Sequence, residues 1–269
     1  MSDKIVSQVG KDGVATVTLN RPEVHNAFDP EMVEALTATF ERLGDDPRVR
    51  ALVLLGAGAN FCAGADIEHM RKSATFSREQ NYQAARQSAR MFHALYQLGK
   101  PTVACVRGAV RGGGCGLIAA CDIAIASRLA TFRLSEVKLG IIPAMIGPYV
   151  IAAIGERMAH RYMLSGEEFD AVEARRIGLV HEAVEEDELD AKVGVMLAHL
   201  HSSGPNAISA IKQLIPVSAH APIDADLVEE TARRIAAVRA TPEAREGLSA
   251  FLEKRKPSWV TPVAPRPTK

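Results

Sequence analysis

The chain has 269 residues with 32 basic and 32 acidic side chains, so its formal net charge at pH 7 is zero. A balanced charge gives no electrostatic footprint for nucleic acid, and an aromatic content of only 5% disfavours stacking on bases. No apolar run approaches the roughly 20 residues of a membrane helix. We therefore expect a soluble, cytoplasmic protein with a large core and without nucleic-acid or membrane partners.

The cysteines and histidines show no metal or redox pattern. The chain has four cysteines among apolar residues, without a C-x-x-C pair, and its histidines form no H-E-x-x-H motif. We expect the cysteines to be reduced and buried, and we expect no metal site. The cysteines are Cys62, Cys105, Cys115 and Cys121.

The N-terminal segments predict a hairpin and then a helix. Residues 5–9 and 14–20 alternate as two strands joined by a turn. Asp29-Pro30-Glu31 predicts a helix start, with Asp29 as the N-cap of a helix over 31–43. The continuous apolar run at 51–55 is typical of a strand buried on both faces of a parallel sheet.

Two glycine-rich turns come next, and the second lies between a strand and a helix. The first turn covers 56–66, and a polar segment at 71–78 and a long helix at 79–98 follow it. The second is Gly112-Gly113-Gly114, between a buried strand at 101–107 and an apolar helix at 113–121. Such a turn directs the first N–H groups of the helix at a bound partner, so it predicts a site for an anionic oxygen. The alternation of strands and helices, continued by a strand at 122–126, predicts an α/β fold with parallel strands.

Glu136 is a lone carboxylate in the apolar segment 132–143. On these residues alone, it is either a functional acid/base or a solvated charge on a half-buried strand. The three glycines likewise form either an anion site or a place of tight helix–strand packing. Neither a P-loop nor a clean G-x-G-x-x-G motif is present, which disfavours the nucleotide binding typical of those motifs.

The C-terminal part carries mainly helical periodicity. Helices are predicted over 147–164, 168–176, 187–202, 205–217, 222–240 and 242–255. We divide the chain into an α/β core over 1–200, a helical region over 201–256 and a proline-rich tail over 257–269. We expect the tail to be disordered.

The ordered segments together resemble the enoyl-CoA hydratase/isomerase (crotonase) family. The matching segments are 20–27, 61–67, 108–122 and 135–143, and 251–256 also fits, so the resemblance covers nearly the whole chain. It implies a crotonase-like spiral of β-β-α repeats with a helical C-terminal trimerisation region, and a homotrimer or a dimer of trimers. It also implies an acyl-CoA thioester substrate, so coenzyme A is part of the substrate and no separate cofactor is expected.

The resemblance assigns roles to individual residues. It implies that the backbone N–H groups of Ala65 and Gly113 hold the thioester oxygen, which becomes negative in an enolate. Glu136 would exchange a proton with carbon. The substrate-binding residues it implies are Val24, His25, Ala27, Ala63, Gly64, Asp66, Ile67, Gly112, Gly116, Pro143, Phe251 and Lys254.

Two positions depart from the family pattern. Gly116 stands where a second glutamate is usual, so the attacking water loses a partner, and a glycine there would leave room for a bulkier acyl chain. Glu68 stands where a lysine often meets a CoA phosphate, and Arg71, Lys72 or Lys254 could take over that role.

Segment 134–144, taken with Gly116, looks most like the branch that hydrates 3-methylglutaconyl-CoA or isohexenylglutaconyl-CoA in leucine or terpene breakdown. Arg111 and Arg133 are the nearest candidates to pair with the distal carboxylate of such a substrate.

The resulting prediction is an enoyl-CoA hydratase, a lyase that adds water to a 2-enoyl-CoA thioester. The alternative is a Δ3,Δ2-enoyl-CoA isomerase, because moving a proton between two carbons needs only one glutamate. The neutral charge and the retained Glu136 disfavour an RNA-binding or scaffold role. A peptidase is disfavoured because Ser135 has no histidine at an evident spacing.

Overall fold

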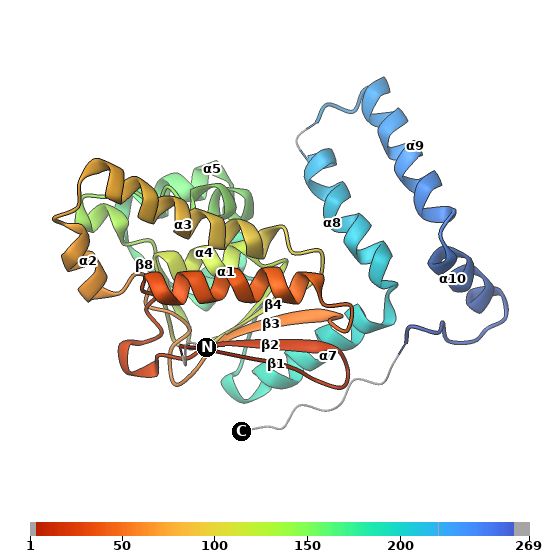
Figure 1. Ribbon diagram of the computed structural model, residues 1–269, viewed down its shortest axis with the longest axis horizontal. Helices are drawn as coiled ribbons and strands as arrows, with labels where there is room; N and C mark the ends of the chain where they lie inside the picture. Colours follow the sequence, from red (N-terminus) through yellow and green to blue (C-terminus); the bar gives the residue numbers. More distant parts are fainter. Residues whose placement is uncertain (1–3, 220, 261–269) are drawn as a thin grey trace.

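The computed structural model describes residues 4–219 and 221–260 (Figure 1). Its strands are β1 (Ile5–Val9), β2 (Val14–Leu19), β3 (Ala51–Gly56), β4 (Thr102–Val106), β5 (Ala109–Arg111), β6 (Ile123–Ser127), β7 (Thr131–Arg133), β8 (Glu168–Asp170) and β9 (Glu182–Val184). Its helices are α1 (Pro30–Asp45), α2 (Ile67–Ser73), α3 (Arg78–Tyr96), α4 (Gly113–Ala120), α5 (Gly147–Ser165), α6 (Ala171–Ile177), α7 (Leu189–Ser202), α8 (Pro205–Ala219), α9 (Ala225–Arg239) and α10 (Pro242–Leu252). Short 3-10 helices are η1 (Pro22–Val24), η2 (Glu136–Leu139) and η3 (Glu186–Glu188).

The strands form two sheets. The larger has the order β1-β2-β3-β4-β6-β9, with β1 and β2 antiparallel and every other neighbouring pair parallel. The predicted N-terminal hairpin is confirmed, with Ile5 opposite Leu19. The smaller sheet has the order β5-β7-β8, in which β5 and β7 are parallel. Parallel strands joined through helices confirm the predicted α/β class.

Strand β3 lies in the core and is buried on both faces, as its apolar run predicts. Leu52 and Leu54 pack in the cluster that includes the buried sides of α1, α3 and α4. Ala51 and Val53 point the other way, into the cluster formed with α7. Helices thus cover both faces of the larger sheet, which is the arrangement expected for parallel strands.

Helix α1 begins as the sequence predicts. The Asp29 carboxylate accepts a hydrogen bond from the Met32 N–H at 2.9 Å, and Pro30 occupies the first turn. Such a cap is worth about 1 kcal/mol, because it satisfies a helix N–H that has no partner within the helix. The cap also fixes the chain just before α1, where segment 24–28 runs beside the first glycine-rich turn.

The short elements differ from the prediction. Strands β5, β7, β8 and β9 have three residues each, which is too short to show an alternating pattern. The helix predicted from 168 begins at Ala171 instead, because residues 168–170 pair with β7. Part of the polar segment at 71–78 belongs to α2, and Glu136 begins a 3-10 helix rather than lying on a strand.

Helices α8, α9 and α10 form an arm that extends from the rest of the chain (Figure 1). The described side chains of α8 and α9 include no buried residue. The arm is tied to the core where Lys212 of α8 meets Asp122, with 2.6 Å between Nζ and Oδ2. None of the described helices is both long and apolar enough to cross a membrane.

The start of the predicted disordered tail is ordered. The indole N–H of Trp259 donates to the Ser202 carbonyl at 3.2 Å, and Arg50 donates to the Trp259 carbonyl at 2.9 Å. Residues 257–260, for which disorder was expected, are thus in contact with Ser202 and Arg50. Residues 261–269, for which disorder was also expected, lie outside the described residues.

Candidate active site

The two glycine-rich turns meet at a cavity of about 140 Å³. Seven residues predicted from the sequence line it, namely Ala63, Gly64, Ala65, Gly112, Gly113, Glu136 and Pro143. The sequence analysis did not predict the apolar part of the lining, which includes Phe28, Phe92, Leu139, Ile141, Ile142 and Ile146. Its members come from separate elements, so only the folded chain shows that they share one cavity.

The backbone of Ala65 is hydrogen-bonded to the segment around Phe28 in a way that turns the Ala65 N–H away from that segment. The Phe28 N–H donates to the Gly64 carbonyl at 2.8 Å, and the Asp66 N–H donates to the Phe28 carbonyl at 3.1 Å. These two bonds make a parallel bridge between Phe28 and Ala65. In such a bridge the N–H of the central residue points to the opposite side. Ala65 lines the cavity, so we infer that its N–H is directed into it.

Gly113 supplies the second N–H. It is the first residue of α4, so its N–H has no carbonyl partner within the helix. A Cβ on Gly64, whose φ is +86°, would lie 3.5 Å from the Gly113 nitrogen and 2.8 Å from the Arg111 carbonyl oxygen. Only a glycine allows the turns to approach so closely. Among residues 4–219 and 221–260, no backbone acceptor is bonded to the N–H of Ala65 or Gly113.

Two unpaired N–H groups beside one small cavity can hold an oxygen that gains negative charge. Each such donor is worth about 3–4 kcal/mol to the transition state in enzymes where one has been removed. The geometry therefore supports the predicted oxyanion hole at Ala65 and Gly113.

Glu136 lies over the second turn, at the start of η2. A Cβ on Gly112 would lie 3.0 Å from the Glu136 Oε1, and the φ of +48° at Gly112 also favours glycine. The Oε2 atom is buried, and the described part of the chain offers it no hydrogen-bond partner. Burial raises the pKa of this carboxyl, although a hydrogen bond to its own backbone opposes the shift. A solvated surface charge would show none of these features, so the functional interpretation of Glu136 is the supported one.

Gly116 does not widen the cavity. A Cβ at this position would lie 2.1 Å from Cγ2 of Ile146 and 3.0 Å from Cε1 of Phe92. The space of the usual second glutamate is therefore filled by these two apolar side chains. The expectation that Gly116 leaves room for a bulkier acyl chain is wrong, and Gly116 does not line the cavity.

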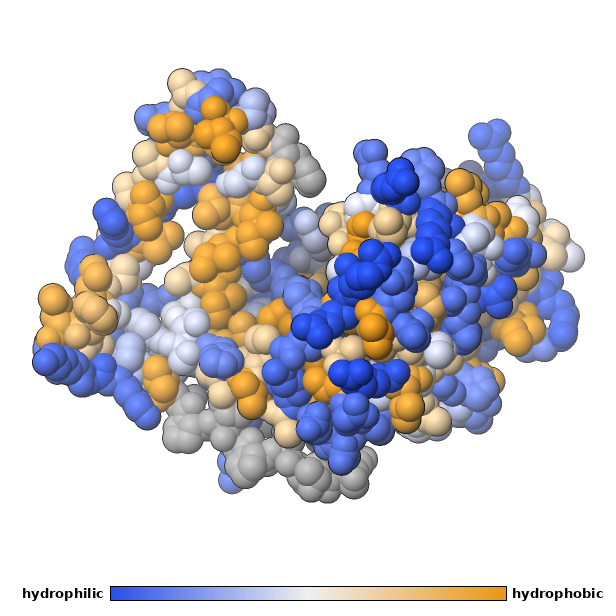
Figure 2. Space-filling model, turned by 180° about the vertical axis from the view of Figure 1, so that it is seen from behind, coloured by the Kyte–Doolittle hydropathy of each residue, from blue (hydrophilic) through white to orange (hydrophobic). Residues whose placement is uncertain are grey.

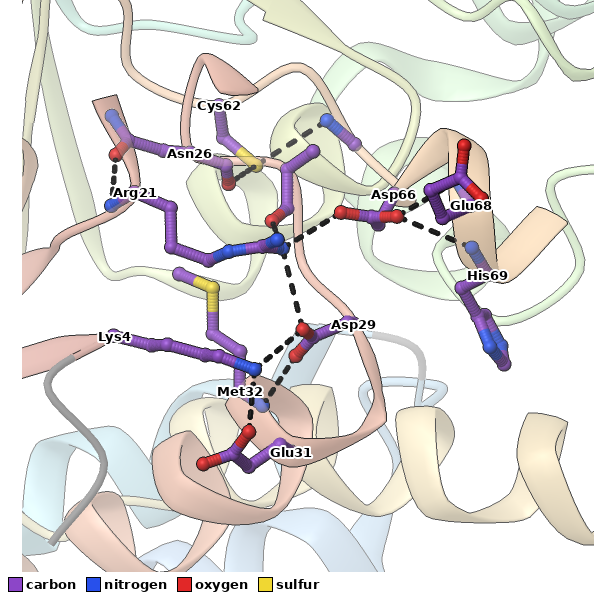
Figure 3. Close-up of polar contacts among 12 residues, drawn as sticks. Lys4, Arg21, Asn26, Asp29, Glu31, Met32, Cys62, Asp66, Glu68 and His69 are labelled. Atoms are coloured by element: carbon purple, nitrogen blue, oxygen red, sulfur yellow. Dashed lines mark hydrogen bonds and ion pairs between the residues drawn. The ribbon is translucent and has the colours of Figure 1, made fainter. Parts of the chain in front are cut away.

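A second cavity, of about 830 Å³, lies next to the first glycine-rich turn. Val24 and Asp66, both predicted to bind substrate, line it, and so does Lys72. Arg71 does not line it and instead pairs with Glu68. Figure 3 shows the charged network on its wall, with Arg21 between Asp29 and Asp66.

Five further predicted residues line neither cavity. His25 is exposed and its ring bonds to Asn60 at 2.9 Å, Ala27 is buried, and Ile67 is exposed at the start of α2. Phe251 lies on α10 and Lys254 just after it, on the arm that extends from the core (Figure 1). Within one chain, the contacts predicted for Phe251 and Lys254 are therefore not formed.

Arg111 and Arg133 make structural contacts outside the small cavity. Arg111 Nη2 lies 2.5 Å from Oε2 of Glu168, and Arg133 Nε donates to the Gly166 carbonyl at 2.7 Å. These contacts join β5 and β7 to the chain around β8. Neither arginine lines the cavity, so the cavity gives no support to the hypothesis that one of them meets a substrate carboxylate.

The sulfur atoms near the site are unreactive. Burial raises the pKa of both the Cys62 and the Cys115 thiols to about 12, so they stay neutral. Within residues 4–219 and 221–260, no group of three His, Cys, Asp or Glu side chains is placed to hold a metal ion.

Comparison with known proteins places this site in a family. A family model described as enoyl-CoA hydratase/isomerase matches residues 10–262. A putative enoyl-CoA hydratase of Thermus thermophilus is 34% identical over 252 residues, which are 94% of this chain and 99% of that protein. A 1,2-epoxyphenylacetyl-CoA isomerase of Escherichia coli is 33% identical over 268 residues, covering 96% of this chain and 99% of the relative.

The fold agrees with these matches. The crystal structure of an enoyl-CoA hydratase from Shewanella pealeana superposes with a TM-score of 0.92 at 41% identity, covering 95% of this chain and 96% of that one. The crotonase-like α/β fold predicted from the sequence is thus confirmed. The chain belongs to the enoyl-CoA hydratase/isomerase family and is an enzyme of that family, which acts on acyl-CoA thioesters.

Proposed function

We propose that this enzyme hydrates a 2-enoyl-CoA thioester with Glu136 as its one acid/base. The Glu136 carboxylate takes a proton from a water molecule as the water oxygen bonds to the beta carbon. The electron pair of the double bond moves to the thioester oxygen, which the N–H groups of Ala65 and Gly113 stabilise. Protonated Glu136 then gives its proton to the alpha carbon, which returns the carboxylate and completes the addition of one water.

The observation that carries this proposal is the buried Oε2 atom of Glu136, which has no hydrogen-bond partner among the described residues. A buried carboxylate oxygen without a partner is costly, so its retention points to a role in the reaction. It lies beside the turn that supplies the Gly113 N–H. A general acid or base has to lie within reach of the proton that it transfers. The alpha carbon is bonded to the thioester carbonyl carbon, so a glutamate beside the Gly113 N–H suits this role.

We propose an uncharged acyl chain for the substrate. The side chains lining the small cavity are apolar apart from Ser135 and Glu136, and no cation is among the described lining residues. A distal carboxylate, as in 3-methylglutaconyl-CoA, would find no partner there and would lie near Glu136. We therefore do not carry that branch of leucine or terpene breakdown into the proposal.

The CoA part would lie along the first glycine-rich turn and into the larger cavity, past Val24 and Asp66. Lys72 is the basic residue of α2 that borders this space, so we assign to it the contact with a CoA phosphate. Because CoA arrives as part of the substrate, the proposed reaction needs no separate cofactor.

We also propose that the arm joins copies of the chain into a homotrimer or a dimer of trimers. Figure 2 shows apolar side chains along the arm, and those of Ile211, Ile215, Val228, Ile235, Phe251 and Leu252 are exposed. Amphipathic helices need an apolar partner, which one chain alone does not supply here.

A Δ3,Δ2-enoyl-CoA isomerase is the second candidate, and Gly116 favours it. Ile146 and Phe92 fill the space of a second glutamate, and Glu136 is the one carboxylate among the described residues that line the small cavity. Isomerisation moves one proton between two carbons and requires no bound water.

Labelled water separates the two functions. The enzyme is incubated in ¹⁸O-water with 2-butenoyl-CoA, 3-hexenoyl-CoA and 3-methylglutaconyl-CoA, and the products are followed by mass spectrometry. We expect a labelled hydroxyl from 2-butenoyl-CoA and little reaction of 3-methylglutaconyl-CoA. If every active substrate shifts its double bond and none gains oxygen, the hydratase proposal is wrong and the isomerase stands.

A further inference from the structure

The oxyanion hole depends on a segment that has no regular structure of its own. Ala65 lies in residues 57–66, which form neither a helix nor a strand beyond isolated bridges. Catalytic groups must be held to within about 0.5 Å of their productive positions. Backbone hydrogen bonds to neighbouring segments hold this turn, among them those from the Ala63 N–H to the His25 carbonyl and from the Asp66 N–H to the Phe28 carbonyl. Its position therefore depends on how those segments are fixed.

Segment 27–29 is the neighbour that contacts both donor residues. Phe28 flanks Ala65 through the two backbone bonds to Gly64 and Asp66. Its ring lies against Gly113, where a Cβ would come within 2.3 Å of the ring Cζ. A shift of Phe28 would therefore move Ala65 and change the packing at Gly113 at the same time.

Arg21 holds this segment in place (Figure 3). Its Nη1 atom donates to the Ala27 carbonyl at 2.7 Å and lies 2.9 Å from Oδ2 of Asp66 and 3.5 Å from Oδ2 of Asp29. The Arg21 main-chain N–H donates to the Asn26 side chain at 2.9 Å, which fixes the arginine itself. One guanidinium thus contacts Ala27 and Asp29, which flank Phe28, and also Asp66, which follows Ala65.

The carboxylates of Asp29 and Asp66 also cap helices, so their contact with Arg21 orients α1 and α2. Asp29 caps α1 through the Met32 N–H, and Asp66 caps α2 through the N–H groups of Glu68 and His69. The arginine therefore fixes the starts of α1 and α2 relative to each other. The oxyanion turn ends where α2 begins, so this relation also sets the position of Ala65.

The charges are poorly hydrated, which makes the contact difficult to replace. The side chains of Arg21 and Asp66 are 15% and 10% exposed. Burial acts to raise the pKa of Asp66, but hydrogen bonds from the His69 N–H and from Arg21 outweigh it, so the pKa is lowered. Asp29 keeps a second cation, since Lys4 Nζ lies 2.6 Å from its Oδ2, whereas Arg21 is the charged partner of Asp66. Removal of the guanidinium would therefore leave the partly buried Asp66 charge uncompensated. Asp66 would move toward water, and the turn at Ala65 would move with it.

We propose that Arg21 is a positioning residue that holds the Ala65 and Gly113 N–H groups at the spacing needed to bind the thioester oxygen. This proposal rests on the proposed function, since it concerns the same oxyanion hole. Arg21 also borders the larger cavity, so its test has to separate an effect on CoA binding from an effect on the reacting oxygen. Lysine would keep the charge, but its flexible stem lacks the rigid guanidinium that places Nη1 against the three acceptors.

The test compares Arg21→Ala and Arg21→Lys with a matched control, Arg107→Ala. Arg107 is also partly buried and pairs with two carboxylates, Glu186 at 2.9 Å and Asp190 at 3.0 Å, which belong to η3 and α7. For each protein, kcat and KM are measured with 2-butenoyl-CoA. The carbonyl stretch of bound butyryl-CoA, labelled with ¹³C at the thioester carbon, is recorded by infrared difference spectroscopy, because this saturated ester binds without reacting.

We expect wild type and Arg107→Ala to lower the carbonyl frequency of bound butyryl-CoA, relative to the free ester, by the same amount. We also expect their kcat values to be equal. Arg21→Ala should lose much of the frequency shift and about 10²-fold in kcat, the usual cost of misplacing reacting groups by about 1 Å. Arg21→Lys should fall between the two, with a smaller change in KM than in kcat.

Three results would count against the proposal. If wild type shows neither turnover nor a carbonyl shift, the proposed function is overturned, and the role of Arg21 with it. If wild type shows both and the Arg21 variants match Arg107→Ala, the role of Arg21 alone is overturned. Should Arg21→Ala not fold, Arg21→Lys decides, since a wild-type carbonyl frequency and kcat in that variant also overturn the proposal.

Discussion

The environment of Glu136 is unfavourable for a charged carboxylate, but the proposed reaction needs a carboxylate at this position. The fold places its carboxylate over Gly112, buries Oε2 and gives that oxygen no partner among the described residues. A glutamine of nearly the same shape would avoid the cost of a buried charge. Active sites often retain such residues at the expense of stability, because the group is needed in its reactive form.

Glu136→Gln is expected to abolish turnover and to stabilise the protein at neutral pH. Loss of a general acid/base costs about 10²–10⁴-fold in kcat. Burial raises the pKa of Glu136 in the folded state above its ordinary value of 4.5. The stabilising effect of the protonated carboxyl is complete below the unfolded-state pKa and is lost as pH rises through the folded-state pKa. Activity is measured with 2-butenoyl-CoA, and melting temperatures are recorded from pH 4 to pH 8.

At pH 8 the variant should melt above wild type, by roughly 2–4 °C for each kcal/mol of difference. Near pH 4 the two melting temperatures should converge, because wild type then carries a protonated carboxyl. If Glu136→Gln retains near-full activity, Glu136 is not the acid/base of the reaction. A variant less stable than wild type at pH 8 would show that the carboxylate has a partner in solution.

At the scale of elements, local signals predicted the parts of the site that lie along the chain. The Asp29 cap and the apolar run of β3 were readable because each is decided by neighbouring residues. Strand β8 was missed because Phe169 and its two neighbours are too short a run to alternate. The filling of the Gly116 space by Ile146 was also hidden, since that contact depends on how α5 packs on α4.

Helix α2 carries the next prediction. Lys72 borders the larger cavity, whereas Arg71, its neighbour, pairs with Glu68. Lys72→Ala should raise KM for 2-butenoyl-CoA by up to about 5-fold, since an exposed charge pair is worth up to about 1 kcal/mol and 1.4 kcal/mol is tenfold. The kcat should stay unchanged, because the phosphate is remote from the reacting carbons. Steady-state kinetics at low and moderate salt measure both parameters.

Arg71→Ala is the matched control, since it removes an equal charge from the same helix and should leave KM unchanged. Added salt should raise the wild-type KM more than that of Lys72→Ala, because salt screens the pair. Equal KM values for the two variants would show that Lys72 makes no phosphate contact.

At the scale of the whole molecule, the chain consists of a well-packed core and an arm that lacks a core of its own. The core buries apolar residues on both faces of the larger sheet, whereas α8 and α9 contribute no buried residue within the described chain. The helical signal of the arm and its division from the core near residue 200 were predicted from the sequence. What covers the apolar faces of the arm was not, because periodicity does not reveal which surface covers a helix face. Phe251 and Lys254 were assigned to the substrate by the family resemblance and not by periodicity. If the arm packs against a second copy of the chain, Phe251 and Lys254 would contact the substrate bound to that copy.

Phe251→Asp combined with Leu252→Asp is expected to break the proposed assembly. These side chains are 80% and 78% exposed on α10, so a charge there costs a lone chain little but opposes burial against a second copy. Light scattering after size exclusion should show wild type at three or six times the chain mass of 28.9 kDa and the variant at smaller species, with helix content retained by circular dichroism. Tyr82→Asp is the control, because Tyr82 is 59% exposed on α3, in the core away from the arm (Figure 1). A wild type that elutes as a monomer, or a double variant that keeps the wild-type mass, would show that the arm does not join the copies.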